Sequence, residues 1–288
     1  MVLSRVRRTL AMAGAILVFF VLAGATYQGV ATALERRQFR HPGRMVDAGG
    51  HQLHIYCSGE GSPTVVLEAG AAGMSAAWGW VQPRISAVTR VCSYDRAGLG
   101  WSEAGDLSYD PAAVAPALNV LLARANEHGP LVLAGQGLGA AFATLYASRF
   151  ADQTAALVLI DAPSDIARGA AINSTTRLVN ASPWLARTGL LRATRMLSRD
   201  AAGLPTPAAG ALSAFLNRPD HLTRAASELS RWDETFALAQ GAPLREGLRM
   251  VRVNAAGGDK VAFLTEAAQA GAATTAVLDA VVAVRSGP

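Results

Sequence analysis

Lysine is almost missing from this 288-residue chain, because Lys260 is the only one and arginine supplies nearly all of the positive charge. The arginines are scattered rather than gathered into a stripe with aromatic side chains, which make up only 6% of the residues. Domains that bind nucleic acids usually carry a concentrated basic surface. The formal net charge of +5 therefore indicates a solvated, arginine-rich surface, and we expect no nucleic-acid partner.

The chain also lacks any internal repeat. Its composition is not that of a disordered protein, because 51% of the residues are apolar. A large buried core is therefore available. The length is typical of an α/β sheet fold that carries an inserted subdomain.

Charged residues are absent from Thr9 to Leu34. The core of this stretch, Leu10 to Ala25, reads LAMAGAILVFFVLAGA, and the whole stretch is long enough for a membrane helix, which needs ~20 apolar residues. Residues 1–34 are therefore predicted to form a signal anchor, that is, an uncleaved transmembrane helix. A cleavable signal peptide is the alternative, because AGA at residues 23–25 resembles a cleavage site. No other apolar run is this long, so we expect at most one span.

The rest of the chain is expected to lie outside the cytoplasm, held at the membrane by this helix, or to be secreted if the segment is cleaved. The arginines do not decide the orientation, because they occur on both sides of the apolar stretch. Residues 35–43 are predicted to form a charged linker broken by Pro42, and residues 44–288 to form the globular domain.

Beyond the linker, short apolar runs alternate with helical patterns, which predicts a mostly parallel sheet with helices on both faces. A mostly helical segment at residues 164–243 interrupts this alternation and is predicted to form a lid over one edge of the sheet. The eight expected strands lie at residues 44–47, 52–57, 64–67, 90–94, 131–134, 157–160, 250–255 and 261–265.

Three stretches carry a resemblance to one family. They read PTVVLEAGAAGMSAAW at residues 63–78, TRVCSYDRAGLGWSE at residues 89–103 and LVLAGQGLGAAFATLYASRFADQTAALVLIDAP at residues 131–163. In this order and spacing they resemble the α/β-hydrolase superfamily, in particular its bacterial, membrane-anchored branch. The resemblance implies an eight-stranded, mostly parallel sheet with a helical lid. It also implies acyl-transfer chemistry on esters, lactones or similar substrates.

In that family the nucleophile stands at the centre of a G-x-S-x-G turn between a strand and a helix. A histidine takes the proton of the serine hydroxyl, and an acidic residue orients the histidine. Here the turn reads Gly135-Gln136-Gly137-Leu138-Gly139. Both outer glycines are present, but Gly137 has no side chain and cannot attack a carbonyl group.

The other two members of the catalytic triad are also degenerate. The loop before the last helix, residues 266–273, contains no histidine. His221 is the only histidine beyond the elbow helix, and we expect it on the surface of the lid. Asp259 stands where the acid is expected, but an aspartate that follows two glycines is more simply a turn residue.

The resemblance further implies two backbone positions and a disulfide. The backbone N–H groups of Ala71 and Leu138 would form the oxyanion hole. In the family's strand order the second strand lies antiparallel beside the fourth, so Cys57 and Cys92 should be close enough to bridge. An exported domain favours a disulfide there. We expect no metal and no cofactor.

Two functional hypotheses follow from these residues. In the first, the chain is a pseudoenzyme of serine-hydrolase ancestry that keeps the fold and binds at most a small apolar ligand or a partner. In the second, it is a hydrolase of ester-like substrates whose catalytic residues have moved, and Ser75 and Ser102 lie near the expected pocket. The loss of nucleophile and base together favours the first hypothesis.

Overall fold

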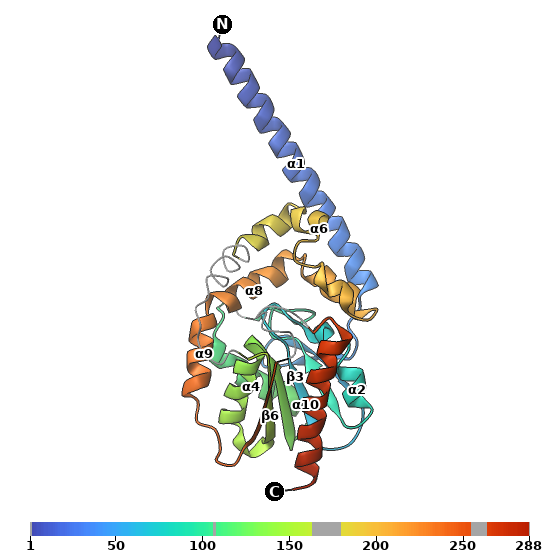
Figure 1. The fold of residues 1–288 in the computed structure, drawn as a ribbon. Coiled ribbons are helices and arrows are strands. Elements are labelled where there is room, and N and C mark those ends of the chain that lie inside the picture. Colours follow the sequence, from blue (N-terminus) through green and yellow to red (C-terminus); the bar gives the residue numbers. More distant parts are fainter. Residues whose placement is uncertain (1, 106–107, 163–179, 255–263, 288) are drawn as a thin grey trace.

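The computed structural model describes residues 2–105, 108–162, 180–254 and 264–287. Helix α1 (Val2–Gln38) leaves the rest of the molecule and carries the N-terminus away from it (Figure 1). The large apolar side chains between Leu10 and Leu22 are exposed along this helix. By length and composition α1 is a candidate membrane span, so the prediction of one continuous apolar helix that leaves the domain is confirmed.

The described residues form a sheet of seven strands in the order β1-β2-β4-β3-β5-β6-β7. β1 and β2 form an antiparallel hairpin, β2 pairs antiparallel with β4, and the other neighbours are parallel. The strands are β1 (Arg44–Asp47), β2 (Gln52–Ser58), β3 (Thr64–Glu68), β4 (Val91–Tyr94), β5 (Leu131–Gln136), β6 (Thr154–Ile160) and β7 (Arg249–Val253). The eighth expected strand, 261–265, lies mostly outside the described residues, and its last two residues are in a loop.

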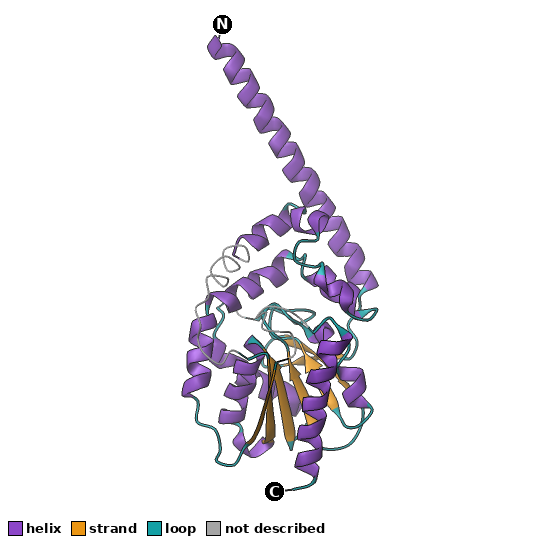
Figure 2. Cartoon of the chain, in the orientation of Figure 1, coloured by secondary structure: helices purple, strands orange, loops and turns teal. Residues whose placement is uncertain are grey.

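Helices cover both faces of the sheet, as Figure 2 shows. Alternate residues of β5 point to opposite faces, so Leu131 and Leu133 join one core and Val132 and Ala134 the other. This double burial explains why the central strands are apolar throughout rather than alternating. The covering helices are α3 (Val114–Arg124) and α4 (Leu138–Arg149) on the first core, and α2 (Gln82–Ser86) and α10 (Ala267–Arg285) on the second.

Short 3-10 turns connect several of these elements, namely η1 (Ser75–Trp78), η2 (Pro111–Ala113) and η3 (Ala151–Gln153). α10 is long and apolar enough to resemble a membrane span. However, its residues Ala270, Val277 and Val281 are fully buried against the sheet. α10 is therefore a core helix of the domain.

The lid is helical, as predicted, and lies between α1 and the sheet in Figure 1. It contains a helix over residues 180–187, then α6 (Leu190–Thr194), η4 (Asp200–Gly203), α7 (Ala208–Phe215), α8 (Pro219–Ser230) and α9 (Trp232–Gly241). Side chains of α8 bind the loops that follow β3 and β4. The lid therefore covers the carboxyl ends of the strands, while the first part of the expected segment, 164–179, lies outside the described residues.

The expected boundary between membrane helix and linker is displaced. α1 continues to Gln38, four residues into the predicted linker. Its last turns pack against the lid. Gln28 is buried and donates a hydrogen bond to the Asn217 carbonyl oxygen at 2.7 Å. Arg192 of α6 forms an ion pair with Glu35. These contacts fix the direction of α1 relative to the lid.

Cys57 and Cys92 form a disulfide, as predicted. The register of β2 against β4 places the two residues directly opposite each other. Closing this loop stabilises the folded chain by about 4 kcal/mol in the chain-entropy treatment. The nearby Glu127 carboxylate forms an ion pair with Arg90.

Candidate functional site

The elbow between β5 and α4 has the backbone geometry of a nucleophile turn. Gly137 has φ 53° and ψ −116°, a conformation that residues with a Cβ rarely adopt. Its N–H donates to the Ile160 carbonyl oxygen at 2.9 Å, and its own carbonyl accepts from the N–H of Ala140 at 3.1 Å. The turn is therefore held between β6 and the first turn of α4, with no side chain at its apex.

Close packing explains the two outer glycines of the elbow. A Cβ on Gly139 would lie 2.3 Å from the carbonyl oxygen of Glu68 and 2.5 Å from that of Ala69. A Cβ on Gly135 would lie 2.3 Å from the carbonyl oxygen of Gly139. Since real Cβ atoms do not come so close to backbone oxygen, both positions exclude any larger residue. The elbow thus keeps its architecture without its nucleophile.

The two positions assigned to the oxyanion hole lie on segments that meet at this elbow. Leu138 is the first residue of α4, where backbone N–H groups have no partner within the helix. Ala71 lies in the turn after β3, which approaches the elbow closely, because a Cβ on Gly70 would lie 3.3 Å from the Gln136 carbonyl oxygen. The structure brings these two segments together, and their role as donors stays a prediction.

The expected base and acid receive no support from the described residues. The segment before α10 is described from Leu264 onward and holds no histidine. Asp259, which stands where the sequence places the acid, lies outside the described residues. Any catalytic base would have to come from elsewhere in the fold, and two buried histidines are the candidates.

His221 is the first buried histidine, which corrects the expectation of a surface residue. It is 1% exposed, because α8 presses it between two loops of the domain. Its Nε2 donates to the Ala72 carbonyl oxygen at 3.0 Å, and its Nδ1 accepts from the N–H of Gly100 at 3.0 Å. Burial lowers the pKa of His221 below its usual value. Both ring nitrogens are engaged, so the side chain has no lone pair for a substrate proton.

His54 is the second buried histidine, and it forms a group with Asp95 and Ser75. Its Nδ1 lies 3.0 Å from Asp95 Oδ2 and 3.4 Å from Ser75 Oγ. Its Nε2 is hydrogen-bonded to the Pro42 carbonyl oxygen. Asp95 also accepts from the N–H groups of Ser75 at 2.6 Å and Trp101 at 2.9 Å. A serine, a histidine and an aspartate therefore meet in a fully buried cluster.

The geometry of this cluster differs from a catalytic triad. In a triad the serine and the acid contact opposite nitrogens of the ring, whereas here Asp95 and Ser75 share Nδ1. Burial would lower the pKa of His54, but the Asp95 carboxylate outweighs it, so the pKa lies above its usual 6.5. Asp95 and the Pro42 carbonyl oxygen are both acceptors, so the ring nitrogens bonded to them carry hydrogens and neither is open to accept the proton of Ser75.

Arg96 is the centre of a second buried cluster beside the elbow. Its guanidinium contacts Glu68 Oε1 at 2.6 Å and both oxygens of Glu228 at 2.7 Å. It also donates to the Ala69 and Gly70 carbonyl oxygens, in the turn that leads to Ala71. Arg96 therefore ties the lid helix α8 to the end of β3.

The sequence did not reveal these two clusters as units. His54 stands between Leu53 and Ile55, and all three are buried on β2. Glu68 ends the fully buried strand β3. A charged or titratable residue inside a buried strand needs a polar partner. His54 and Glu68 within apolar strands were therefore the sequence signal that could have indicated the two clusters. The partners, Asp95 and Arg96, are adjacent in the chain.

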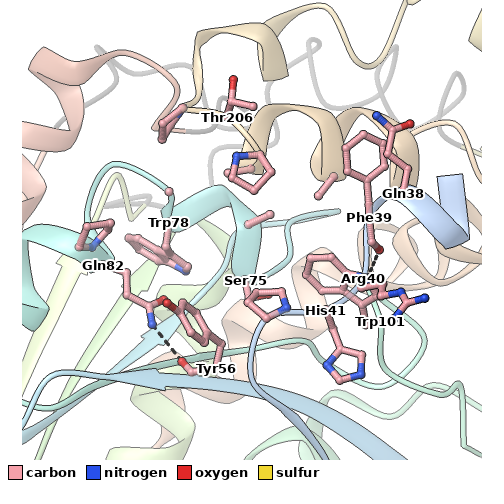
Figure 3. A pocket seen from close by; sticks show the side chains of 18 residues that line it. Gln38, Phe39, Arg40, His41, Tyr56, Ser75, Trp78, Gln82, Trp101 and Thr206 are labelled. Carbon is pink, nitrogen blue, oxygen red and sulfur yellow. Dashed lines mark hydrogen bonds between the residues drawn. The ribbon is translucent and has the colours of Figure 1, made fainter.

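Two cavities of about 480 and 780 Å³ flank these clusters. The smaller one lies where α1 enters the domain and is lined by the end of α1, η1 and α7. Figure 3 shows the aromatic side chains of Phe39, Trp78 and Trp101 around it. The larger one contains Arg96 and Glu228. Gly137 lines neither of them.

A sequence profile of the Alpha/beta hydrolase family matches residues 65–287, which is most of the chain. The chain belongs to the alpha/beta hydrolase family. One curated relative, an uncharacterised protein of Schizosaccharomyces pombe, is 37% identical over 87 residues. That match covers 29% of this chain and only 16% of the relative, so the chain spans a small part of that protein.

Solved structures of other alpha/beta hydrolases share the fold. A putative lipase from Acinetobacter baumannii is 16% identical with a TM-score of 0.62, covering 91% of this chain and 97% of the lipase. The enol-lactonase from Burkholderia xenovorans is 17% identical with a TM-score of 0.60, covering 83% of this chain and all of the lactonase. The epoxide hydrolase CorEH is 16% identical with a TM-score of 0.61, covering 73% and 81%. At these identities the likeness shows the fold alone.

Proposed function

We propose that this alpha/beta hydrolase does not carry out acyl transfer by the family's serine mechanism and instead binds a small apolar ligand. The observation that carries the proposal is Gly137, which has the elbow conformation at the start of α4 but no side chain. An oxyanion hole without its nucleophile leaves only ~10³–10⁴-fold acceleration over water. Enzymes typically reach at least 10⁶-fold.

The two buried histidines support the proposal, because neither is placed as a base. His221 uses both nitrogens in hydrogen bonds to backbone atoms. His54 uses both in contacts with Asp95 and Pro42. The remaining histidines of the described residues, His41, His51 and His128, lie on the N-terminal linker, the β1–β2 turn and the loop before β5. Restoring chemistry would require a base as well as a nucleophile.

The smaller cavity supports ligand binding. Its volume of about 480 Å³ lies within the ~300–1,000 Å³ of ordinary ligand pockets. Eight of its 18 lining residues are aromatic residues or prolines, and Arg40 and His41 stand at its linker side. This composition favours an apolar body with an acceptor or anionic end.

Anchoring by α1 completes the proposal, with the globular domain outside the cytoplasm. The exposed apolar surface of α1 is unfavourable in water and suits a bilayer. The Cys57–Cys92 disulfide favours an oxidising compartment. A soluble, secreted form would arise if the segment were cleaved.

The test is the reaction of the purified full-length protein with a fluorophosphonate probe, combined with turnover of a panel of short and medium chain esters. We expect no covalent labelling and no turnover above the rate with heat-unfolded protein. Labelling at a defined serine, together with turnover, would overturn the proposal.

The alternative function, a hydrolase with displaced catalytic residues, is favoured by one observation, the contact of Ser75 with His54. Ser75→Ala separates the two readings, and Ser230→Ala, at the exposed end of α8, serves as the control. If Ser75 were the nucleophile, its replacement would abolish labelling by the probe. The Nδ1 that Ser75 shares with Asp95 and the hydrogen bond between Nε2 and the Pro42 carbonyl oxygen argue against that result.

A further inference from the structure

The outer face of the lid lies directly beside α1. A Cβ on Gly24 would lie 2.0 Å from the Thr188 carbonyl oxygen, and one on Gly189 would lie 2.9 Å from the Gly24 carbonyl oxygen. The two backbones are therefore in contact, and only glycine allows it. Gly24 is also the last residue but one of the core of the apolar stretch, which ends at Ala25. The lid thus begins to cover α1 at the end of its membrane segment.

The length of α1 before this contact is too short to hold the lid clear of a bilayer. At 1.5 Å per residue, about 24 Å of helix separates Arg8 from Gly24. The hydrocarbon core of a bilayer is about 30 Å thick. With Arg8 at the far surface, the bilayer therefore extends beyond Gly24 along the helix. A tilted helix reaches less far across the bilayer and strengthens this conclusion.

The lid segment beside Gly24 exposes large apolar side chains of the kind found at membrane surfaces. Trp184 is 72% exposed, Met196 is 53% exposed and Leu190 is 49% exposed. Figure 1 shows this segment at the end of the domain from which α1 leaves. Tryptophan is enriched at the interface between bilayer and water, where its ring lies among the headgroups.

The charge of the same segment is of one sign. Residues 180–199 contain four arginines and no acidic residue. Arg192 is engaged with Glu35 of α1. The remaining three, Arg187, Arg195 and Arg199, are exposed, and Arg187 lies over the ring of Trp184 at 4.9 Å. Such side chains attract anionic headgroups.

We propose that the lid's outer face, formed by Trp184, Leu190, Met196 and these three arginines, lies in the headgroup region of the bilayer that α1 spans. This inference rests on the proposed anchoring by α1. The occupant of the face is an anionic lipid surface. Through Gln28 and Glu35 the anchor then holds the lid against the membrane, and α8 joins the lid to the rest of the domain.

The experiment compares two labelled sites on the full-length chain. Both native cysteines are in the disulfide, so a single introduced cysteine can be labelled selectively. Met196→Cys places a polarity-sensitive fluorophore on the face, and Val282→Cys on α10, 56% exposed, is the matched control. Both proteins are reconstituted into vesicles of phosphatidylcholine and phosphatidylglycerol that carry a headgroup-level quencher.

We expect the lipid-borne quencher to reduce emission at position 196 several-fold more than at position 282. Replacing Arg187, Arg195 and Arg199 by glutamine should remove the part of this effect that depends on phosphatidylglycerol. Flotation of the vesicles through a density gradient shows whether the protein stays bound to them. Equal quenching at both positions in protein that floats with the vesicles would overturn the proposed contact of the lid with the headgroups, but not the anchoring by α1. If the protein did not float after a salt wash, the anchoring would be overturned too. Protection of position 196 in a detergent-solubilised dimer would assign the face to a second copy.

Discussion

At the scale of single residues, the elbow separates backbone geometry from chemistry. A residue with a Cβ at φ 53° and ψ −116° bears a strain of about 1–3 kcal/mol. Glycine enters this region without that cost. A working enzyme tolerates the strain because its nucleophile must stand at the apex of the turn. Gly137 removes the nucleophile and the strain together, which fits a chain that no longer performs acyl transfer.

Gly137→Ser is therefore expected to destabilise the protein by about 1–3 kcal/mol without restoring esterase activity. Thermal unfolding and ester turnover of the purified variant measure the two effects. Gly241→Ser is the matched control, because a Cβ at the end of α9 meets open space and no left-handed φ. Strong turnover from Gly137→Ser alone would show that a base is in place, and the proposed function would fall.

The buried carboxyl group of Glu68 is expected to make the stability of the protein depend on pH. Burial raises the pKa of Glu68 to about 7, and the Arg96 guanidinium only partly opposes this. The folded chain therefore binds more protons than the unfolded chain between the usual value of 4.5 and about pH 7. Since protons favour the state that binds them, stability should fall as pH rises through this window and level off above it.

The contribution of Glu68 should reach up to about 3 kcal/mol at 1.4 kcal/mol per pKa unit. Chemical unfolding at a series of pH values from 4 to about 8 would reveal it. In Glu68→Gln the free energy of unfolding should change less steeply with pH between these values, whatever its absolute size. The contribution of His54, which has the same sign, remains in both proteins. An unchanged slope would mean that Glu68 is ionised throughout.

At the scale of elements, α8 holds the lid to the domain through buried polar contacts. Glu228 is fully buried and pairs with Arg96, and His221 bridges the loops after β3 and β4. Removing one partner of a buried ion pair leaves the other charge without compensation. The lid should therefore be coupled to the core cooperatively and should not move as an independent flap.

Glu228→Ala is expected to lower the free energy of unfolding by about 3–5 kcal/mol and to raise hydrogen exchange in α8. Glu234→Ala is the control from the same lid, because its pair with Arg231 is half-exposed and should contribute less than about 1 kcal/mol. Similar losses in the two variants would mean that the buried cluster does not fasten the lid.

The elements differ in how far the sequence could predict them. The strands are short apolar runs with turns between them, and β1 was predicted to the residue. Helix α4 follows from the elbow. Helix α1 continues to Gln38, and its last turns pair through Glu35 with Arg192, a residue so far along the chain that the local pattern does not show the contact. His221 was misplaced for the same reason: a polar residue at a helix start becomes buried only when two distant loops close over it.

At the scale of the whole molecule, the redox state of the disulfide and the orientation of α1 both report on the compartment that the globular domain occupies. Cys57 and Cys92 face each other across β2 and β4, so they would be adjacent thiols in a reducing compartment and a disulfide in an oxidising one. The orientation of α1 decides which compartment the domain occupies. The redox state of these two residues in cells is therefore a readout of topology.

We expect the full-length protein in intact cells to have no free thiol, and a phosphatase fused after the last residue to be active outside the cytoplasm. Alkylation with a maleimide of high mass, before and after reduction, measures the thiols. The purified Cys57→Ala, Cys92→Ala variant should lose about 4 kcal/mol of stability relative to the oxidised protein, and the reduced wild type should lose a similar amount. Free thiols in cells, together with a silent phosphatase, would place the domain in the cytoplasm. The lid's outer face would then meet the inner leaflet, whose anionic lipids its arginines would also bind, so this measurement fixes the side of the membrane independently of whether the lid touches it.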